Sequence, residues 1–175
     1  MAIPATYQAT MARALPGQVS DTSAYNIDGA CVLDGSANVF VGVAVQNGGV
    51  DSMGNKLIKP MAASGKAYGV AIRSHFQTTS ADGRMVYVPG GGINVMNEGR
   101  VWMLAVDTQT KQPYGTAIKI EDSTGKVDTE SGTVEPNWIA TGDFTEFDGL
   151  KLIEVQVKPL QTGRSLSAFF YGGVK

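Results

Sequence analysis

The chain has 175 residues, enough for one domain that buries its own hydrophobic core. Charged residues make up only 17% of it and the formal net charge is −2, without any cluster of Lys and Arg. This composition argues against nucleic-acid binding, because neutralising phosphates requires clustered positive charge. The single cysteine, Cys31, excludes an internal disulfide and a thiolate metal cage, and its apolar neighbours predict a small buried side chain.

The N-terminus lacks the basic and apolar regions of a secretory signal, and no run approaches the roughly 18 apolar residues of a membrane-spanning helix. We therefore expect synthesis in a cytoplasm and no membrane partner. Residues 1–25 show no clear period and are punctuated by Pro4, Pro16 and Gly17, which predicts an extended N-terminal arm.

The first strong strand signal is residues 39–46, where valines alternate with period 2. Turn residues at 47–49 are expected to end that strand, and residues 51–64 are expected to form a loop. Further strands are predicted at residues 68–72, 85–88, 93–96, 99–106, 118–121, 126–129, 138–141 and 150–158. The last run has two apolar phases, which a β-bulge near Leu152 would reconcile.

Many short strands, frequent turn signals and no amphipathic helix predict an all-β fold, a single β-sandwich or barrel that is jelly-roll-like. We expect the core to span residues 26–159, between the arm at 1–25 and a C-terminal tail at 160–175. Trp102 lies in a run that is apolar on both faces, which predicts burial.

Candidate chemistry is sparse. His75 is the only histidine, so any Ser-His-Asp or Cys-His site would depend on it, and its neighbours fit a polar strand end equally well. Asp143, Glu146 and Asp148 could serve glycoside hydrolysis or hold calcium, but their place before a strand favours a solvated hairpin tip. We expect no catalytic residue, no cofactor and no metal, and therefore not an enzyme.

Short motifs resemble tailed-bacteriophage capsid cement, or head decoration, proteins. They are Ala14-Leu-Pro-Gly-Gln-Val-Ser-Asp21, Tyr68-Gly-Val-Ala-Ile-Arg-Ser74, Asn97-Glu-Gly-Arg-Val-Trp102 and Gln112-Pro-Tyr-Gly115 with the following 118–120 strand. The order and spacing are similar over roughly the first two-thirds of the chain. The segment after Leu150 is longer than this family's pattern, and residues 47–60 look like an insertion.

The resemblance implies a β-rich structural protein that binds the outer surface of an icosahedral phage head and stabilises junctions between capsomers. It implies the major capsid protein as partner, a virion location after synthesis in the host cytoplasm, and a homo-oligomer, with a trimer favoured over a dimer. Multivalent contacts of a symmetric oligomer would give a stable clamp. Arg73 and Arg100 are expected to form structural pairs or rim contacts.

Partner contacts are predicted in the arm and in the aromatic tail, where rigid apolar side chains concentrate binding energy. The predicted contact residues are Ile3, Tyr7, Met11, Leu15, Phe169, Phe170 and Tyr171. Two other hypotheses remain open. A carbohydrate-binding β-sandwich requires an exposed aromatic platform, and a small β-barrel hydrolase requires His75 within hydrogen-bond reach of a nucleophile in a cleft.

Overall fold

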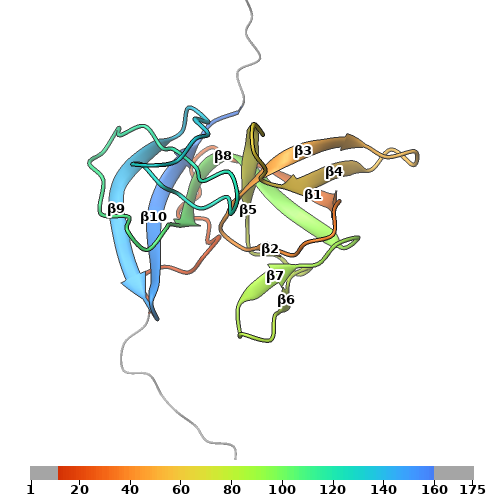
Figure 1. Cartoon of the computed structure of the whole chain (residues 1–175), viewed down its shortest axis with the longest axis horizontal. Helices are drawn as coiled ribbons and strands as arrows, with labels where there is room; N and C mark the ends of the chain where they lie inside the picture. The colour runs from red at the N-terminus through yellow and green to blue at the C-terminus, as the bar shows by residue number, and fades with distance from the viewer. Residues whose placement is uncertain (1–11, 160–175) are drawn as a thin grey trace, which may run out of the picture.

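The structure, a computed structural model, describes residues 12–159, which form strands joined by turns and bends, with no helix among them (Figure 1). The strands are β1 (Asn26–Leu33), β2 (Val39–Phe40), β3 (Ala44–Val50), β4 (Lys56–Pro60), β5 (Ala67–Ala71), β6 (Thr78–Thr79), β7 (Met85–Tyr87), β8 (Gly92–Leu104), β9 (Ile139–Phe147) and β10 (Leu150–Val157). The predicted all-β fold is confirmed. No described residue belongs to a helix long and apolar enough to cross a membrane.

A closed barrel forms the larger part of the structure. Its strands follow the order β1-β4-β3-β5-β8, and pairing of β1 with β8 closes the ring. The β1–β4 pair is parallel, with Val32 opposite Leu57, while the other pairs of the ring are antiparallel. The sheet continues beyond β8 into β10 and β9, and a separate small sheet has the order β2-β7-β6. Of the predicted alternatives, sandwich or barrel, the structure is a barrel.

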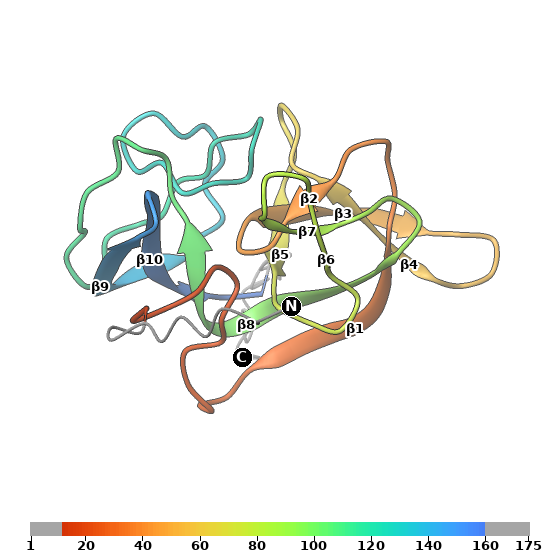
Figure 2. The same cartoon turned by 90° about the horizontal axis from the view of Figure 1, so that it is seen from below.

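Strand β8 belongs to two layers. Its first half pairs with β1 and β5 in the barrel, and its second half pairs with β10. Figure 2 shows β8 passing from the barrel toward β10 and β9. Sequence analysis predicted two separate strands, at 93–96 and 99–106, but one strand of 13 residues spans nearly all of both. We use the term outer layer for β9, β10 and residues 105–138.

Two hydrophobic clusters lie on opposite sides of β8 and β10. The barrel core contains Ala14, Cys31, Leu33, Val39, Val41, Val43, Val45, Ile58, Ala71, Tyr87, Ile93, Val95, Trp102, Leu104 and Leu152. The outer core contains Ala44, Met61, Ala67, Val70, Ile72, Met96, Val101, Met103, Ala105, Ile118, Ile120, Val127, Val134, Trp138, Ala140, Ile153, Val155 and Val157. The predicted burial of Trp102 and Cys31 is confirmed, at 6% and 2% exposure.

These two cores explain the two apolar phases of β10. Leu152 faces the barrel core, whereas Ile153 and Val155 face the outer core. The ladder between β10 and β8 is continuous from Leu152 to Val157, so the bulge predicted near Leu152 is absent from that ladder, but the pairing of β10 with β9 does shift in register between Ile153 and Val155. The irregularity lies in the partner strand β9, where residues 141–143 fall between the partners of Ile153 and Val155.

Other boundaries differ from prediction because tertiary contacts override local turn signals. Residues 51–64 are not one loop, since β4 lies within them and pairs with β3. The run 39–46 is interrupted at Gly42, whose φ of 90° and close approach to the Gly17 amide leave no room for a side chain. The turn residues at 47–49 do not end β3, which continues to Val50 with a register shift between Asn47 and Gly49.

The predicted strands at 118–121 and 126–129 do not form, and isolated β-bridges and individual backbone hydrogen bonds join this region to its neighbours. Their alternating side chains are nevertheless buried: Ile118, Ile120 and Val127 are at most 1% exposed. The alternation therefore marks burial in the outer core without a sheet ladder.

Part of the predicted arm packs on the body. Val19 bridges Val101, and the Gly17 and Ser20 amides donate to the carbonyls of Trp102 and Arg100. The Arg100 guanidinium lies 3.1 Å from a carboxylate oxygen of Asp21, in agreement with the structural pairing expected for Arg100. The boundaries of arm, core and tail otherwise stay a prediction.

Candidate interaction surfaces

Leu15 alone among the seven predicted contact residues lies within the described part of the chain. It is 37% exposed and borders an apolar groove. The other six, Ile3, Tyr7, Met11, Phe169, Phe170 and Tyr171, lie outside the described residues.

The groove has a volume of about 330 Å³. It lies where the base of the arm, the β2–β7 sheet and the turn between β9 and β10 meet. Its apolar lining includes Leu15, Phe40, Met85, Phe147 and Leu150. A concave apolar site of this size fits large apolar side chains of a partner better than an open, solvated surface would.

Charged side chains stand at the groove's edges. The Arg84 guanidinium lies 3.6 Å from an Asp82 carboxylate oxygen and stacks 5.7 Å from the centre of the Phe40 ring. Arg73 also lines the groove, and its guanidinium has no hydrogen-bond or ion-pair partner within residues 12–159. A guanidinium offers five N–H donors and no acceptor, so Arg73 is available to a partner's oxygen atoms.

The second surface is the tip of the β3–β4 hairpin, residues 50–55, which projects from the barrel (Figure 1). Val50 is 66% exposed and Met53 is 83% exposed, the largest such fractions for apolar side chains within the hairpin. This stretch was predicted to be a loop and an insertion, and none of its residues was predicted as a partner contact. An exposed Met next to turn residues is the signal that could have pointed to it.

Asp51 gives the hairpin tip a defined shape. Its side chain accepts hydrogen bonds from the Met53 and Asn55 amides and from the Asn55 side chain, each at 2.8 Å. These bonds, led by the one from the Asn55 side chain, lower the pKa of the Asp51 carboxyl. Val50 and Met53 are therefore displayed on a turn that is ordered before any partner arrives, which reduces the entropic cost of binding.

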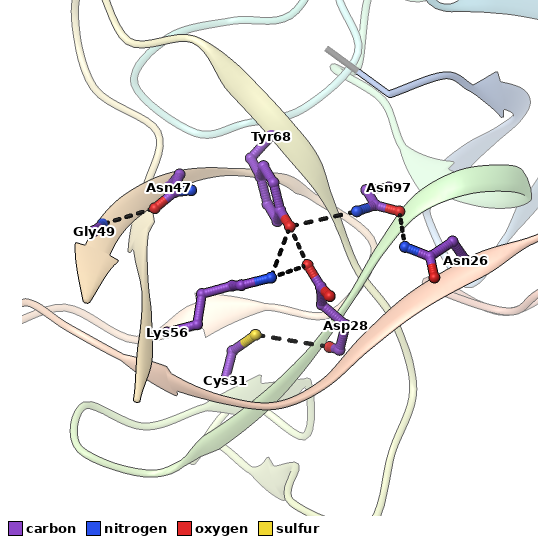
Figure 3. A network of polar contacts seen from close by, with 8 residues as sticks. All are labelled: Asn26, Asp28, Cys31, Asn47, Gly49, Lys56, Tyr68 and Asn97. Carbon is purple, nitrogen blue, oxygen red and sulfur yellow. Dashed lines mark hydrogen bonds and ion pairs between the residues drawn. The ribbon is translucent and has the colours of Figure 1, made fainter. Parts of the chain in front are cut away.

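A polar cluster, which we call the plug, crosses one end of the barrel interior (Figure 3). The Asp28 carboxylate of β1 accepts from the Tyr68 hydroxyl of β5 and from Lys56 Nζ of β4, the latter at 2.7 Å. Asn97 of β8 donates to the Tyr68 hydroxyl at 3.3 Å, and Asn26 donates to Asn97 at 2.7 Å. Since β5 is not a sheet neighbour of β1 or β4, these bonds join strands across the ring.

Burial and pairing oppose each other in the plug. Desolvation raises the pKa of Asp28, but hydrogen bonds from Lys56 and Tyr68 outweigh it, so the net pKa is lowered. The bond to Asp28 raises the pKa of Lys56 despite its partial burial. Desolvation and the bond to Asp28 raise the pKa of Tyr68. The plug therefore holds a charged Asp–Lys pair and a neutral tyrosine, an arrangement that fits a structural lock.

The structure does not meet the requirements of the other two hypotheses. His75 is exposed and has no hydrogen-bond partner within the described chain. The hydrolase hypothesis requires His75 within hydrogen-bond reach of a nucleophile, and the described residues supply no such contact. Trp102 and Trp138 are buried. The exposed aromatics lie in separate segments, Tyr25 before β1, Phe76 between β5 and β6, and Tyr114 between β8 and β9, so residues 12–159 supply no aromatic platform.

The remaining candidate chemical groups are three carboxylates and one thiol. Asp143 and Glu146 lie within β9, not in the predicted loop, while Asp148 lies in the β9–β10 turn. Residues 12–159 contain no group of three His, Cys, Asp or Glu side chains that could hold a metal ion. Desolvation raises the pKa of the Cys31 thiol, which keeps it protonated and unreactive.

Comparison with known proteins gives two findings. The family described as structural cement protein (E217 gp24/Pam3 gp6) matches residues 3–158. A chain in the structure described as the capsid of Myoviridae phage XM1 is similar in fold, with a TM-score of 0.63 and 18% sequence identity, over 91% of this chain and 99% of that one. The comparison with curated proteins gives no match.

Proposed function

This chain belongs to the phage structural cement protein family, and from that premise we propose that it binds the outer surface of an icosahedral head and stabilises the junctions between capsomers. Its partner would be the major capsid protein, and it would act as a homo-oligomer, with a trimer favoured. An oligomer contacts several coat subunits at once, so modest individual contacts add up to a long-lived attachment.

The observation that supports this proposal most directly is the hairpin tip. Val50 and Met53 lie at a turn that is already ordered. The charged side chain of the tip, Asp51, accepts hydrogen bonds from Met53 and Asn55 within the tip itself. We assign the tip to an apolar pocket of the coat shell. The tail residues Phe169, Phe170 and Tyr171 stay a second proposed contact with the shell.

Rigidity of the body fits the mechanical task. The ring of β1, β4, β3, β5 and β8 has no free edge, and the plug joins opposite strands of that ring. A clamp across a pressurised junction transmits load only if its own structure does not yield. The barrel would therefore act as the stiff part, with contacts made by its projections.

Co-sedimentation with shells of the cognate coat protein, before and after shell expansion, tests the proposal. We expect saturable binding to expanded shells, with a stoichiometry that identifies the occupied symmetry axis. Absence of binding to either form would contradict the cement placement for this coat protein and would make a glycan-array screen the next experiment.

A charged double variant, Val50→Asp with Met53→Asp, tests the tip itself. We expect binding to expanded shells to weaken at least about 30-fold, because two apolar anchors become charged, while the free energy of unfolding changes by less than about 0.5 kcal/mol. The matched control is Ala62→Asp with Ala63→Asp, which adds the same charge at exposed positions outside the hairpin. Equal binding by both double variants would remove the tip from the contact surface.

A further inference from the structure

We propose that residues 1–11 of one copy lie as an extended strand in the groove of a neighbouring copy, so that the oligomer is held by exchanged N-terminal arms. This inference rests on the proposed homo-oligomer but not on binding to a shell. The groove is lined largely by apolar residues, and the described residues of the same chain leave it open.

The arm has the chemistry of a groove-binding strand. Residues 1–11 contain no charged side chain, although the chain as a whole has 30 such residues, 14 basic and 16 acidic. Odd positions from 3 to 11 read Ile, Ala, Tyr, Ala and Met, and even positions from 4 to 10 read Pro, Thr, Gln and Thr. In an extended segment this alternation places every large apolar side chain on one face. The clear alternation of residues 3–11 is hidden when residues 1–25 are considered together.

The groove complements that strand. Most of its lining residues are apolar, and its Asp82–Arg84 pair is internally compensated, while Asp148 also lines it. Arg73 lacks a partner in the described chain and could donate to backbone carbonyls of an extended segment, which present acceptors at regular intervals. The tail is a poorer occupant, because it contains Arg164 and Lys175 and begins after Val157, at the other end of β10 from the groove residue Leu150.

The base of the arm is fixed at the groove's rim. Ala14 is 1% exposed in the barrel core, and Leu15 lines the groove. The Arg13 guanidinium lies 2.6 Å from an Asp143 carboxylate oxygen on β9 and 5.9 Å from the centre of the Trp102 ring. The arm therefore starts on the β9 side of its own groove.

Entry into its own groove would require the chain to reverse immediately. Residues 5–15 contain no Gly, Pro, Asn or Asp, the residues that build tight turns. An arm of 11 residues spans up to about 36 Å when extended, so it can extend far beyond its point of attachment. A groove on a neighbouring copy requires no such reversal.

Disulfide trapping in the free protein tests the exchange. One chain, with a first affinity tag, has Met11→Cys in its arm, and a second chain, with another tag, has Met85→Cys in its groove. After co-expression and mild oxidation we expect a disulfide-linked species that bears both tags. The native Cys31 does not compete, because it is 2% exposed. Replacing the second chain by Ala62→Cys, which is exposed and not among the residues that line the groove, should abolish the cross-link.

The failure outcomes are separate. If the mixture gives no two-tag product, or if a Met11→Cys, Met85→Cys double variant closes its disulfide within single chains, the exchange is excluded. Sedimentation equilibrium supplies an independent readout: Tyr7→Asp should raise the oligomer's dissociation constant at least about 30-fold, and Gln8→Asp, on the polar face, should not. Equal effects of both, or a monomeric parent protein, would also overturn the inference. Shell co-sedimentation remains unaffected as a test of the cement function.

Discussion

The barrel and the outer layer both bury large apolar side chains, yet they satisfy their backbones in different ways. In the barrel, strands pair around a closed ring. In the outer layer, residues 105–138 form no strand and rely on individual bonds, such as Ile118 amide to Trp138 carbonyl at 2.9 Å and Val127 amide to Leu104 carbonyl at 2.9 Å. An alternation of apolar and polar residues can therefore lead to burial within a sheet, as in the barrel, or to burial without a sheet, as in the outer layer.

The two regions are nevertheless joined closely. Strand β8 contributes Trp102 to one core and Met103 to the other, and the Ala44 amide of β3 donates to the Gly125 carbonyl at 2.8 Å. We therefore expect the regions to unfold together, and the following substitutions test that expectation.

Trp138→Ala should have the largest effect. Trp138 is 1% exposed, and its indole N–H donates to the Lys158 carbonyl at 3.0 Å. We expect a loss of about 3–5 kcal/mol in the free energy of unfolding. In urea titrations followed by the remaining tryptophan, Trp102 of the barrel core, the transition should stay single. Leu33→Ala, the barrel counterpart, should shift the same transition by about 2–5 kcal/mol. A barrel transition left at its wild-type midpoint by Trp138→Ala would show that the regions are independent.

Gly125→Ala should disturb the contact between the outer layer and the barrel. A Cβ at Gly125 would lie 2.4 Å from the Ala44 carbonyl oxygen, and the residue's φ is 73°. We expect a cost of about 2–4 kcal/mol, measured by denaturant unfolding. Gly83→Ala is the matched control, because its φ of 78° is similar but no atom lies within 4 Å of the added Cβ. The control should lower the free energy of unfolding by only about 1 kcal/mol. Equal losses for the two variants would show that the contact between Gly125 and Ala44 is not tightly packed.

Asp28→Ala should weaken the barrel by a smaller amount. It leaves Lys56 and Tyr68 without their shared acceptor, which we expect to cost about 1–3 kcal/mol. Asp34→Ala removes a carboxylate from an exposed pair with Lys59, at 3.2 Å, and should cost less than about 1 kcal/mol. Similar unfolding midpoints for the two variants would argue that the plug does not brace the ring.

The pH dependence of the plug provides the finest test. The pKa of Asp28 is lowered from 3.8, so its stabilisation is present above 3.8 and is lost as pH falls through the lower folded value. The pKa of Lys56 is raised from 10.5, so its stabilisation is present below 10.5 and is lost only at more alkaline pH. The difference in unfolding free energy between wild type and Asp28→Ala should therefore be constant from about pH 5 to 9 and shrink in stronger acid. A decline within that plateau would contradict the assigned pairing.

Much of the barrel could be predicted because its signals are local. The apolar run at 68–72 and the turn at Asp148-Gly149, where both residues have positive φ, correspond to β5 and to the β9–β10 turn. The outer layer misled the same reasoning, because Ile118 and Ile120 alternate for burial without a pairing partner of sufficient length. Alternation reports which side chains are buried, and only the surrounding chain decides whether a ladder forms.

The interaction surfaces were harder to predict for a different reason. The groove collects Leu15, Phe40 and Phe147 from distant parts of the chain, so no spacing announces it. The plug likewise joins Asp28, Lys56 and Tyr68 across the ring. Such sites depend on three-dimensional closure, which a single sequence does not reveal.

The closure of β1 onto β8 has a consequence for how the protein is made. Strand β1 begins at Asn26 but pairs with Ile93 and Val95, and the barrel core is completed only by Leu152. Strand β1 can pair with β4 earlier, but the pairing with β8 that closes the ring must wait until β8 has left the ribosome. Folding dominated by such distant pairings takes about milliseconds to seconds. The apolar faces of the earlier strands therefore stay exposed during synthesis until β8 and β10 emerge.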